Sequence, residues 1–161
     1  MSILRGLISE NVDRHTRDMV TLTATASITS AAHAGRTLLM GEVGGDAAAT
    51  FTLPAATGTG SVFKFVVSVV NTSNYLIKVA DATDTIDGQI MITDADGTAA
   101  TSFVTAAASD TITLNGTTTG GGAIGDYVEL IDIASNQYAV SGMVTCAAGS
   151  NIATMFSATV S

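Results

Sequence analysis

Apolar and hydroxyl residues alternate over ten positions, from Val20 to Thr29, and this is the strongest periodic pattern in the chain. A period of two places the apolar side chains on one face of a β-strand and the hydroxyls on the other. Residues 1–18 fit no strand pattern and hold much of the charge of the N-terminal region. The pattern therefore predicts a short N-terminal arm over residues 1–18 and a β domain over residues 19–161.

Strand-sized runs continue to the C-terminus, separated by turns rich in Gly, Asn and Asp. After the first strand we expect strands at residues 37–42, 49–53, 62–70, 75–80, 85–93, 101–105, 110–115, 127–133, 137–146 and 152–160. Short strands at this spacing are typical of a sandwich or barrel of antiparallel strands. We therefore expect an all-β fold with very little helix, and no repeat period indicates a solenoid.

Two of these segments carry more specific expectations. Residues 62–70 are almost entirely apolar, which predicts a central strand covered on both faces. Residues 115–125 are rich in Gly and Thr, which predicts a long, mobile hairpin loop.

Charge and composition narrow the range of partners. Six basic residues face fourteen acidic ones, a formal net charge of −8, and binding to nucleic acid or an anionic membrane needs clustered Lys and Arg. We expect neither partner. Hydrophobic residues make up 47% of the chain, but aromatic residues only 5%, so the core is thin in large side chains. This composition favours a homo-oligomer in which neighbouring copies complete the burial.

The residues that nucleophilic catalysis requires are not found in a recognisable arrangement. Both histidines, His15 and His33, lie in the N-terminal quarter, and no Gly-x-Ser-x-Gly motif occurs. Cys146 is the only cysteine and lies in an apolar and Thr alternation, which is typical of a small core residue. The Gly-rich segments lack the Gly-Lys-Ser/Thr of a phosphate loop. We therefore expect that the protein is not an enzyme and binds no cofactor.

An acidic segment between residues 81 and 96 leaves three interpretations open. The least favoured is acid–base catalysis of glycoside hydrolysis, because the chain has no Trp and only three Tyr to bind a sugar. Asp94-Ala-Asp-Gly97 resembles the start of a calcium loop, but position 105 is Thr where that loop needs Glu. Asp-Gly pairs also form tight turns, and we favour this interpretation and predict no metal site. A structural cation near Asp94 and Asp96 is the main alternative.

The N-terminal arm is the candidate binding site. Its apolar and cationic residues suit docking on a partner protein, because arginine side chains bind carboxylates in pairs of hydrogen bonds. The alternative is a terminus without a partner. The candidate residues are Leu4, Arg5, Leu7, Ile8, Arg14, His15 and Arg17.

Several segments resemble a pattern shared by small virion proteins of tailed bacteriophages, and together they span about residues 49–142. The class that this order of elements matches best is the head decoration, or cement, protein. The resemblance implies a β-sandwich or jelly-roll-like subunit, commonly trimeric, on the outside of the capsid. The segments are residues 49–67, 75–80, 109–121 and 125–135.

The expected function follows from this resemblance. A decoration protein is a structural component of the virion that binds the capsid exterior and bridges and stabilises major capsid protein subunits. The same sequence vocabulary occurs in phage fibre, spike and collar modules, which bind a host-surface glycan or another virion protein. The resemblance supplies no residue-level binding motif, so the candidate residues of the arm rest on this sequence alone.

Overall fold

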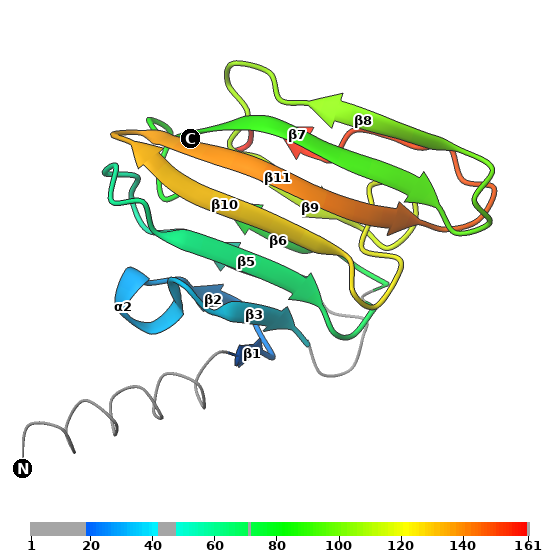
Figure 1. Ribbon diagram of the computed structural model, residues 1–161, viewed down its shortest axis with the longest axis horizontal. Coiled ribbons are helices and arrows are strands. Elements are labelled where there is room, and N and C mark those ends of the chain that lie inside the picture. The colour runs from blue at the N-terminus through cyan, green and yellow to red at the C-terminus, as the bar shows by residue number, and fades with distance from the viewer. Residues whose placement is uncertain (1–18, 42–47, 71, 161) are drawn as a thin grey trace, which may run out of the picture.

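The computed structural model describes residues 19–41, 48–70 and 72–160, which form two β-sheets and one short helix, α2 (Ser30–His33), as Figure 1 shows. The all-β prediction is confirmed. In the seven-stranded sheet the order is β1 (Met19–Leu22), β3 (Thr37–Met40), β5 (Val62–Val67), β10 (Tyr127–Ala134), β11 (Gln137–Cys146), β7 (Thr85–Asp94) and β8 (Ala100–Val104). In the five-stranded sheet it is β12 (Phe156–Ser157), β9 (Thr111–Leu114), β6 (Tyr75–Lys78), β4 (Ala49–Thr52) and β2 (Ala26–Ser27).

The first six strands alternate between the two sheets along the chain. As a result β1, β3 and β5 are neighbours in one sheet, and β2, β4 and β6 are neighbours in the other. Each strand lies one full coil of chain from its neighbour and therefore runs in the same direction. Among the described strands, five of the ten pairings are parallel. The prediction of antiparallel strands is wrong for this half of the fold, and both sheets are mixed.

The coils have uneven lengths, which explains why the sequence shows no repeat. Met19 pairs with Thr37 and Thr37 with Lys64, so the register advances by 18 residues and then by 27. A coiled path with such unequal turns leaves no fixed period for sequence inspection to detect.

The alternating run from Val20 to Thr29 divides between the sheets. Its first part is β1 of the seven-stranded sheet, and its second part is β2 of the five-stranded sheet. Leu22 and Ile28 both point into the core, with 5% and 2% of their surface exposed. The alternation therefore predicts the orientation of the side chains correctly, although the strand does not continue through residues 23–25.

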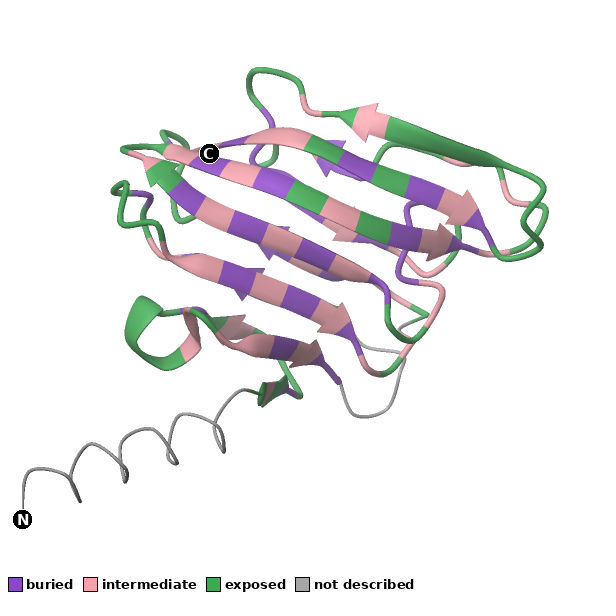
Figure 2. Cartoon of the chain, viewed as in Figure 1, coloured by how far each residue is buried: buried purple, intermediate pink, exposed green. Residues whose placement is uncertain are grey.

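The core lies between the two sheets, and aromatic side chains from both sheets pack against one another in it. Figure 2 shows buried and less buried residues alternating along the strands, as a two-layer arrangement requires. Phe51 of β4 stacks on Phe65 of β5 with ring centroids 5.8 Å apart, and on Tyr75 of β6 at 6.0 Å. The buried Tyr75 hydroxyl donates to the Val69 carbonyl oxygen at 2.9 Å, which offsets the cost of removing it from water.

The longest pairing in the molecule depends on one glycine. β7 and β11 run parallel over ten residue pairs, with Gly88 opposite Val140. Gly88 has φ +143°, and an added Cβ would collide with the Val140 carbonyl oxygen. Only glycine permits both this backbone conformation and this close approach of the two strands.

Residues 115–125 join β9 to β10 and cross between the sheets, so the prediction of a hairpin loop is wrong. The Asn115 side-chain oxygen accepts hydrogen bonds from the backbone N–H groups of Thr117, Thr118 and Thr119, at 2.9, 2.8 and 3.0 Å. Thr119 is buried. The segment is thus an anchored loop, held by its own Asn side chain.

Candidate functional site

The arm residues singled out in the sequence all lie outside the described residues. They are Leu4, Arg5, Leu7, Ile8, Arg14, His15 and Arg17. Their role in binding stays a prediction, and the candidate site that the structure can describe must be sought in the β body.

The potential nucleophile and base of the body do not form a catalytic pair. Cys146, at the end of β11, is fully buried, and burial raises the pKa of its thiol, which disfavours the reactive thiolate. His33 ends the short helix α2, where its Nδ1 lies 2.9 Å from the Thr29 N–H. Thr29 caps the same helix, so the His33 ring belongs to a local capping arrangement.

Asp94 and Asp96 form a turn between β7 and β8. Asp94 Oδ1 accepts hydrogen bonds from the N–H groups of Thr98 and Ala99, at 2.9 and 3.1 Å, and Asp94 Oδ2 accepts one from the Thr98 hydroxyl at 2.9 Å. The bond from Ala99 is the main reason that the pKa of Asp94 lies below its ordinary value. Within the described part of the chain, no group of three or more His, Cys, Asp or Glu residues is arranged to hold a metal ion. The turn interpretation agrees with this geometry.

Asp132 of β10 clamps the loop that follows β4. Its Oδ1 accepts the N–H groups of Thr57 and Gly58 at 3.0 and 2.6 Å, and its Oδ2 accepts the N–H and hydroxyl of Thr59 at 3.0 and 2.7 Å. Burial by itself would raise the pKa of Asp132, but the bonds from Thr59, Gly58 and Thr57 outweigh it and hold the pKa below its ordinary value. The buried carboxylate therefore holds this loop in its observed conformation.

Asp126, the residue before β10, has the same role. Its Oδ2 accepts hydrogen bonds from the N–H groups of Gly121, Ala123 and Thr145, at 3.0, 3.3 and 2.8 Å. Here burial dominates and raises the pKa of Asp126 above its ordinary value. The carboxylate joins the loop before β10 to β11.

Asp110 fastens the C-terminal residues to β9. Its Oδ1 accepts the Thr159 N–H at 2.8 Å and the Thr111 hydroxyl at 2.7 Å, and its Oδ2 accepts the Val160 N–H at 3.1 Å. Several of the acidic residues that make the chain so negative therefore hold loops and the C-terminal residues in place.

Asp84 differs from these clamps, because one of its oxygens has no partner. It is 1% exposed, and its Oδ2 accepts the Ala56 N–H at 3.2 Å, but its buried Oδ1 has no hydrogen-bond partner among the described residues. Burial raises the pKa of Asp84. Tyr138, whose pKa burial also raises, donates its hydroxyl to the Pro54 carbonyl oxygen at 2.9 Å. Because no group of three or more His, Cys, Asp or Glu residues in the described part of the chain could hold a metal ion, Asp84 has the surroundings of a buried structural carboxyl.

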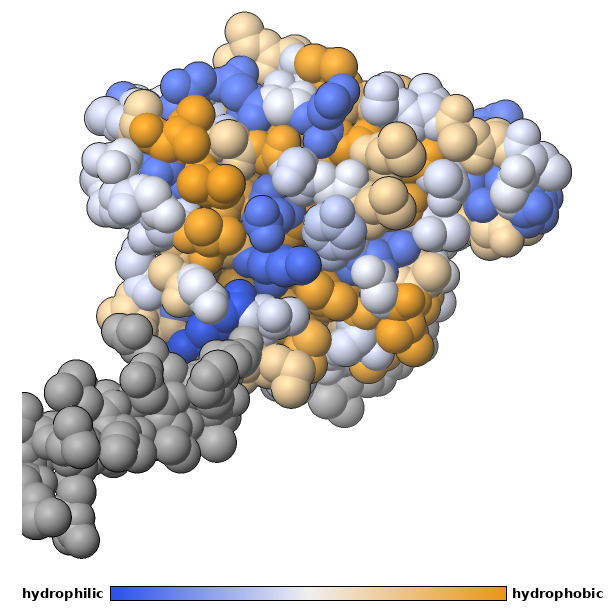
Figure 3. Space-filling view, viewed as in Figure 1, coloured by the Kyte–Doolittle hydropathy of each residue, from blue (hydrophilic) through white to orange (hydrophobic). Residues whose placement is uncertain are grey.

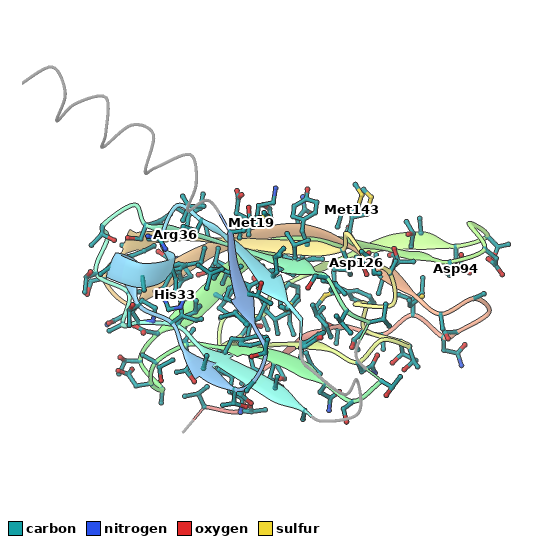
Figure 4. The ribbon with its side chains drawn as sticks, turned by 90° about the horizontal axis from the view of Figure 1, so that it is seen from below. Met19, His33, Arg36, Asp94, Asp126 and Met143 are labelled. Carbon is teal, nitrogen blue, oxygen red and sulfur yellow. The ribbon has the colours of Figure 1, made fainter. Side chains whose placement is uncertain are left out.

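The outward side of the seven-stranded sheet carries the feature most suited to binding. Paired residues of five adjacent strands form an apolar row across it, and Met143 and Met91 in this row are 50% and 47% exposed. Figure 4 shows Met143 projecting away from the core on this side. The apolar row consists of Leu39, Val66, Tyr127, Met143 and Met91.

A polar row runs beside the apolar row and is tied to it. It consists of Lys64, Glu129, Ser141 and Gln89, which are paired across β5, β10, β11 and β7. The Lys64 ammonium lies over the ring of Tyr127 at 4.8 Å from its centroid, a cation–π contact. The polar row therefore places one cation beside one carboxylate at the centre of the face.

A third row, consisting of Val62, Ile131, Ala139 and Asp87, lies on the other side of the polar row. Asp87 accepts a hydrogen bond from the Gln137 side chain at 2.7 Å. We call the three rows together the outer face of the seven-stranded sheet. Figure 3 shows this face, with hydrophobic residues on either side of a hydrophilic stripe.

The five-stranded sheet has a different outward side. One outward row is made only of hydroxyl residues and a lysine: Ser27, Thr52, Lys78, Thr111 and Ser157. The next row is Thr50, Leu76 and Thr113. Thr111 of this row is buried, because its hydroxyl bonds to Asp110 and Thr159 and the C-terminal residues cover it. The other hydroxyls of the row are at least partly open to water.

Sequence reasoning missed the outer face, although a signal existed. The apolar run at residues 62–70 predicts a strand covered on both sides, but in the structure only one side of β5 faces the core. Val62, Lys64 and Val66 point outward and are half-buried. A continuous apolar run whose outward half is not covered by any other described part of the chain indicates a contact surface.

Comparisons with known protein families, with curated proteins and with solved structures found no match to this chain. No helix in the described part of the chain is long and apolar enough to span a membrane. The functional conclusion therefore rests on the residues and their geometry, together with the resemblance noted in the sequence.

Proposed function

We propose that this protein is a structural component of a phage virion that binds the outside of the capsid and bridges and stabilises major capsid protein subunits. The observation that carries the proposal is the difference between the two outward sides: one is lined mostly by hydroxyl residues, and the other presents an apolar row suited to protein contact. The resemblance to head decoration proteins of tailed phages adds the nature of the assembly. The clamped carboxylates support a binding role over a catalytic one.

In this proposal the arm attaches the body to the capsid. Residues Arg5, Arg14 and Arg17 pair with carboxylates of the major capsid protein, and Leu4, Leu7 and Ile8 bury apolar surface against it. Each copy adds a modest interface energy. Many copies on one shell multiply the effect. A capsid subunit that is bridged to its neighbours by several bound copies cannot dissociate until all of these contacts are broken. The body adopts a β-sandwich or jelly-roll-like arrangement suited to a rigid surface subunit.

The decisive experiment compares the full chain with a variant lacking residues 2–17. Both are mixed with capsids that lack this protein, and bound copies are measured after sedimentation. We expect the full chain to bind in hundreds of copies and the variant to remain in solution with an unchanged circular dichroism spectrum. Equal binding of both proteins would refute attachment through the arm.

Heat stability and copy number test the function itself. Capsids with the full chain should release DNA at a higher temperature than capsids without it. Release at the same temperature would contradict the stabilising role. A handful of copies at the tail or collar in images of the particle would favour the alternative, a fibre, spike or collar module.

A further inference from the structure

We propose that the outer face of the seven-stranded sheet binds the same face of a second copy of this chain. The two copies are related by a two-fold axis that runs parallel to the strands, between β5 and β10. This inference goes beyond the proposed function and does not depend on it, because the contact forms between copies in solution without any capsid.

The apolar row supplies the driving force. It crosses five adjacent strands, and its two methionines are about half exposed in the single chain. The proposed axis stacks four residues of this row on the same four residues of the second copy, with Val66 opposite Tyr127 and Leu39 opposite Met143. Met91 of β7 then lies opposite Thr21 of β1. Stacking removes the exposed methionine and tyrosine surface from water, and methionine adapts its shape to aromatic neighbours.

Charge identifies the partner as a second copy. Lys64 and Glu129 are direct neighbours across β5 and β10, so the two-fold axis between these strands places Lys64 of each copy opposite Glu129 of the other. A symmetric contact is self-complementary in this way. The chain as a whole carries a net charge of −8, and two copies that met through another acidic surface would repel each other. On the outer face the central charges balance.

The size of the face agrees with a specific but weak contact. The thirteen residues of the three rows, with strands about 4.8 Å apart and rows about 6.8 Å apart, occupy about 420 Å². Two such faces bury about 850 Å² in total, which is the range of weak and transient protein contacts. We therefore expect a dissociation constant in the micromolar range, which is weaker binding than in an obligate dimer.

The polar row determines the register of the stack. Lys64 already lies over the Tyr127 ring, which holds its ammonium close to the apolar row. Any slip of the two faces along the strands would place charged residues against apolar ones, and an unpaired buried charge is costly. One arrangement of the two faces is therefore favoured over the others.

Charge reversal tests the contact directly. The masses of the full chain, of Lys64→Glu and of Glu129→Lys are measured by native mass spectrometry and sedimentation at about 10 to 500 µM. We expect the wild-type chain to dimerise and each variant to dimerise about 30-fold more weakly. A mixture of the two variants should form mixed dimers. In a mixed dimer one contact joins the two substituted side chains, which carry opposite charges, and the other contact keeps the native pair of Lys64 and Glu129. Rescue in the mixture separates this contact from any effect within one chain.

Two further variants complete the test. Met143→Lys should abolish the dimer while keeping the thermal unfolding midpoint of the single chain. Lys78→Glu makes the same charge change on the outward side of the five-stranded sheet and should leave the dimer intact. A wild-type chain that stays monomeric up to about 500 µM overturns the proposal. So does a dimer that survives Met143→Lys, a mixture without rescue, or a trimeric mass, which would match instead the trimer that the family resemblance implies.

Discussion

The outward sides of the two sheets differ although both belong to the same layered body. In the five-stranded sheet, outward positions are mostly Thr and Ser, as at Thr50, Thr52 and Thr113. In the seven-stranded sheet, apolar side chains such as Leu39, Val66 and Met143 occupy outward positions. The alternation along a strand thus determines which residues face the core. The chemistry of the outward residues then indicates whether that side contacts water or a protein.

The difference can be traced to local sequence. β4 reads Ala-Thr-Phe-Thr, so each apolar residue is followed by a hydroxyl. β3 reads Thr-Leu-Leu-Met and β5 reads Val-Phe-Lys-Phe-Val-Val, in which the outward positions are also largely apolar. Strands with apolar residues on both sides are usual where both sides are covered. The seven-stranded sheet is therefore patterned for a covering layer that residues 19–41, 48–70 and 72–160 do not provide.

The largest expected effect comes from removing what holds the two sheets together. Phe51→Ala deletes the ring that stacks on Phe65 and Tyr75, and a buried Phe→Ala change costs about 4 kcal/mol. We expect the free energy of unfolding in urea to fall by about this amount, and both outward sides to lose their order together. A loss below about 1 kcal/mol would contradict the role of Phe51 as the link between the sheets. Ser27→Ala, on the outward side of β2, is the matched control and should change little.

A smaller loss of stability is expected from a change that affects only one of the two sheets. Asp132→Asn weakens the clamp on residues 57–59 and should cost about 2 kcal/mol at neutral pH. Hydrogen exchange should increase in this loop and at the end of β10, while β4, β6 and β9 stay protected. Asp87→Asn, which changes a carboxylate with one side-chain partner, is the control.

The pH dependence of this variant has a definite sign. The pKa of Asp132 is lowered in the folded protein, so its stabilising contribution is present above the unfolded pKa of about 4 and is lost as the pH falls through the folded value. The difference in unfolding free energy between wild type and Asp132→Asn should therefore shrink below about pH 4. A difference that stays constant down to about pH 2 would show that ionisation of Asp132 contributes nothing.

The smallest change in stability is expected from substitutions on the outward side of the five-stranded sheet. The double change Thr50→Val and Thr113→Val flanks Leu76 with apolar neighbours and gives the five-stranded sheet a short apolar row of its own. We expect stability to change by less than about 0.5 kcal/mol, and new self-association to appear in sedimentation. If the variant stays as soluble and as little associated as before, an apolar row of three residues is insufficient to form a contact.

Much of the fold could be predicted, and the errors have physical causes. Strands were expected close to their observed positions, as at Gln137–Cys146, because turn residues and alternation are local signals. The parallel pairings of β1, β3 and β5 were missed, because partner choice depends on coils of 18 and 27 residues with no repeated motif. The clamping role of Asp132 was also missed, since its partners Thr57, Gly58 and Thr59 lie in a loop that only the fold brings near.

The sequence by itself determined the β character of the chain, the inward positions of residues such as Leu22 and Ile28, and the acidic net charge. These properties depend on near neighbours and on composition. Only the tertiary structure decided that Leu39, Val66, Tyr127, Met143 and Met91 lie side by side. They come from five strands spread over more than a hundred residues, and a row across a sheet exists only once the order and register of its strands are set.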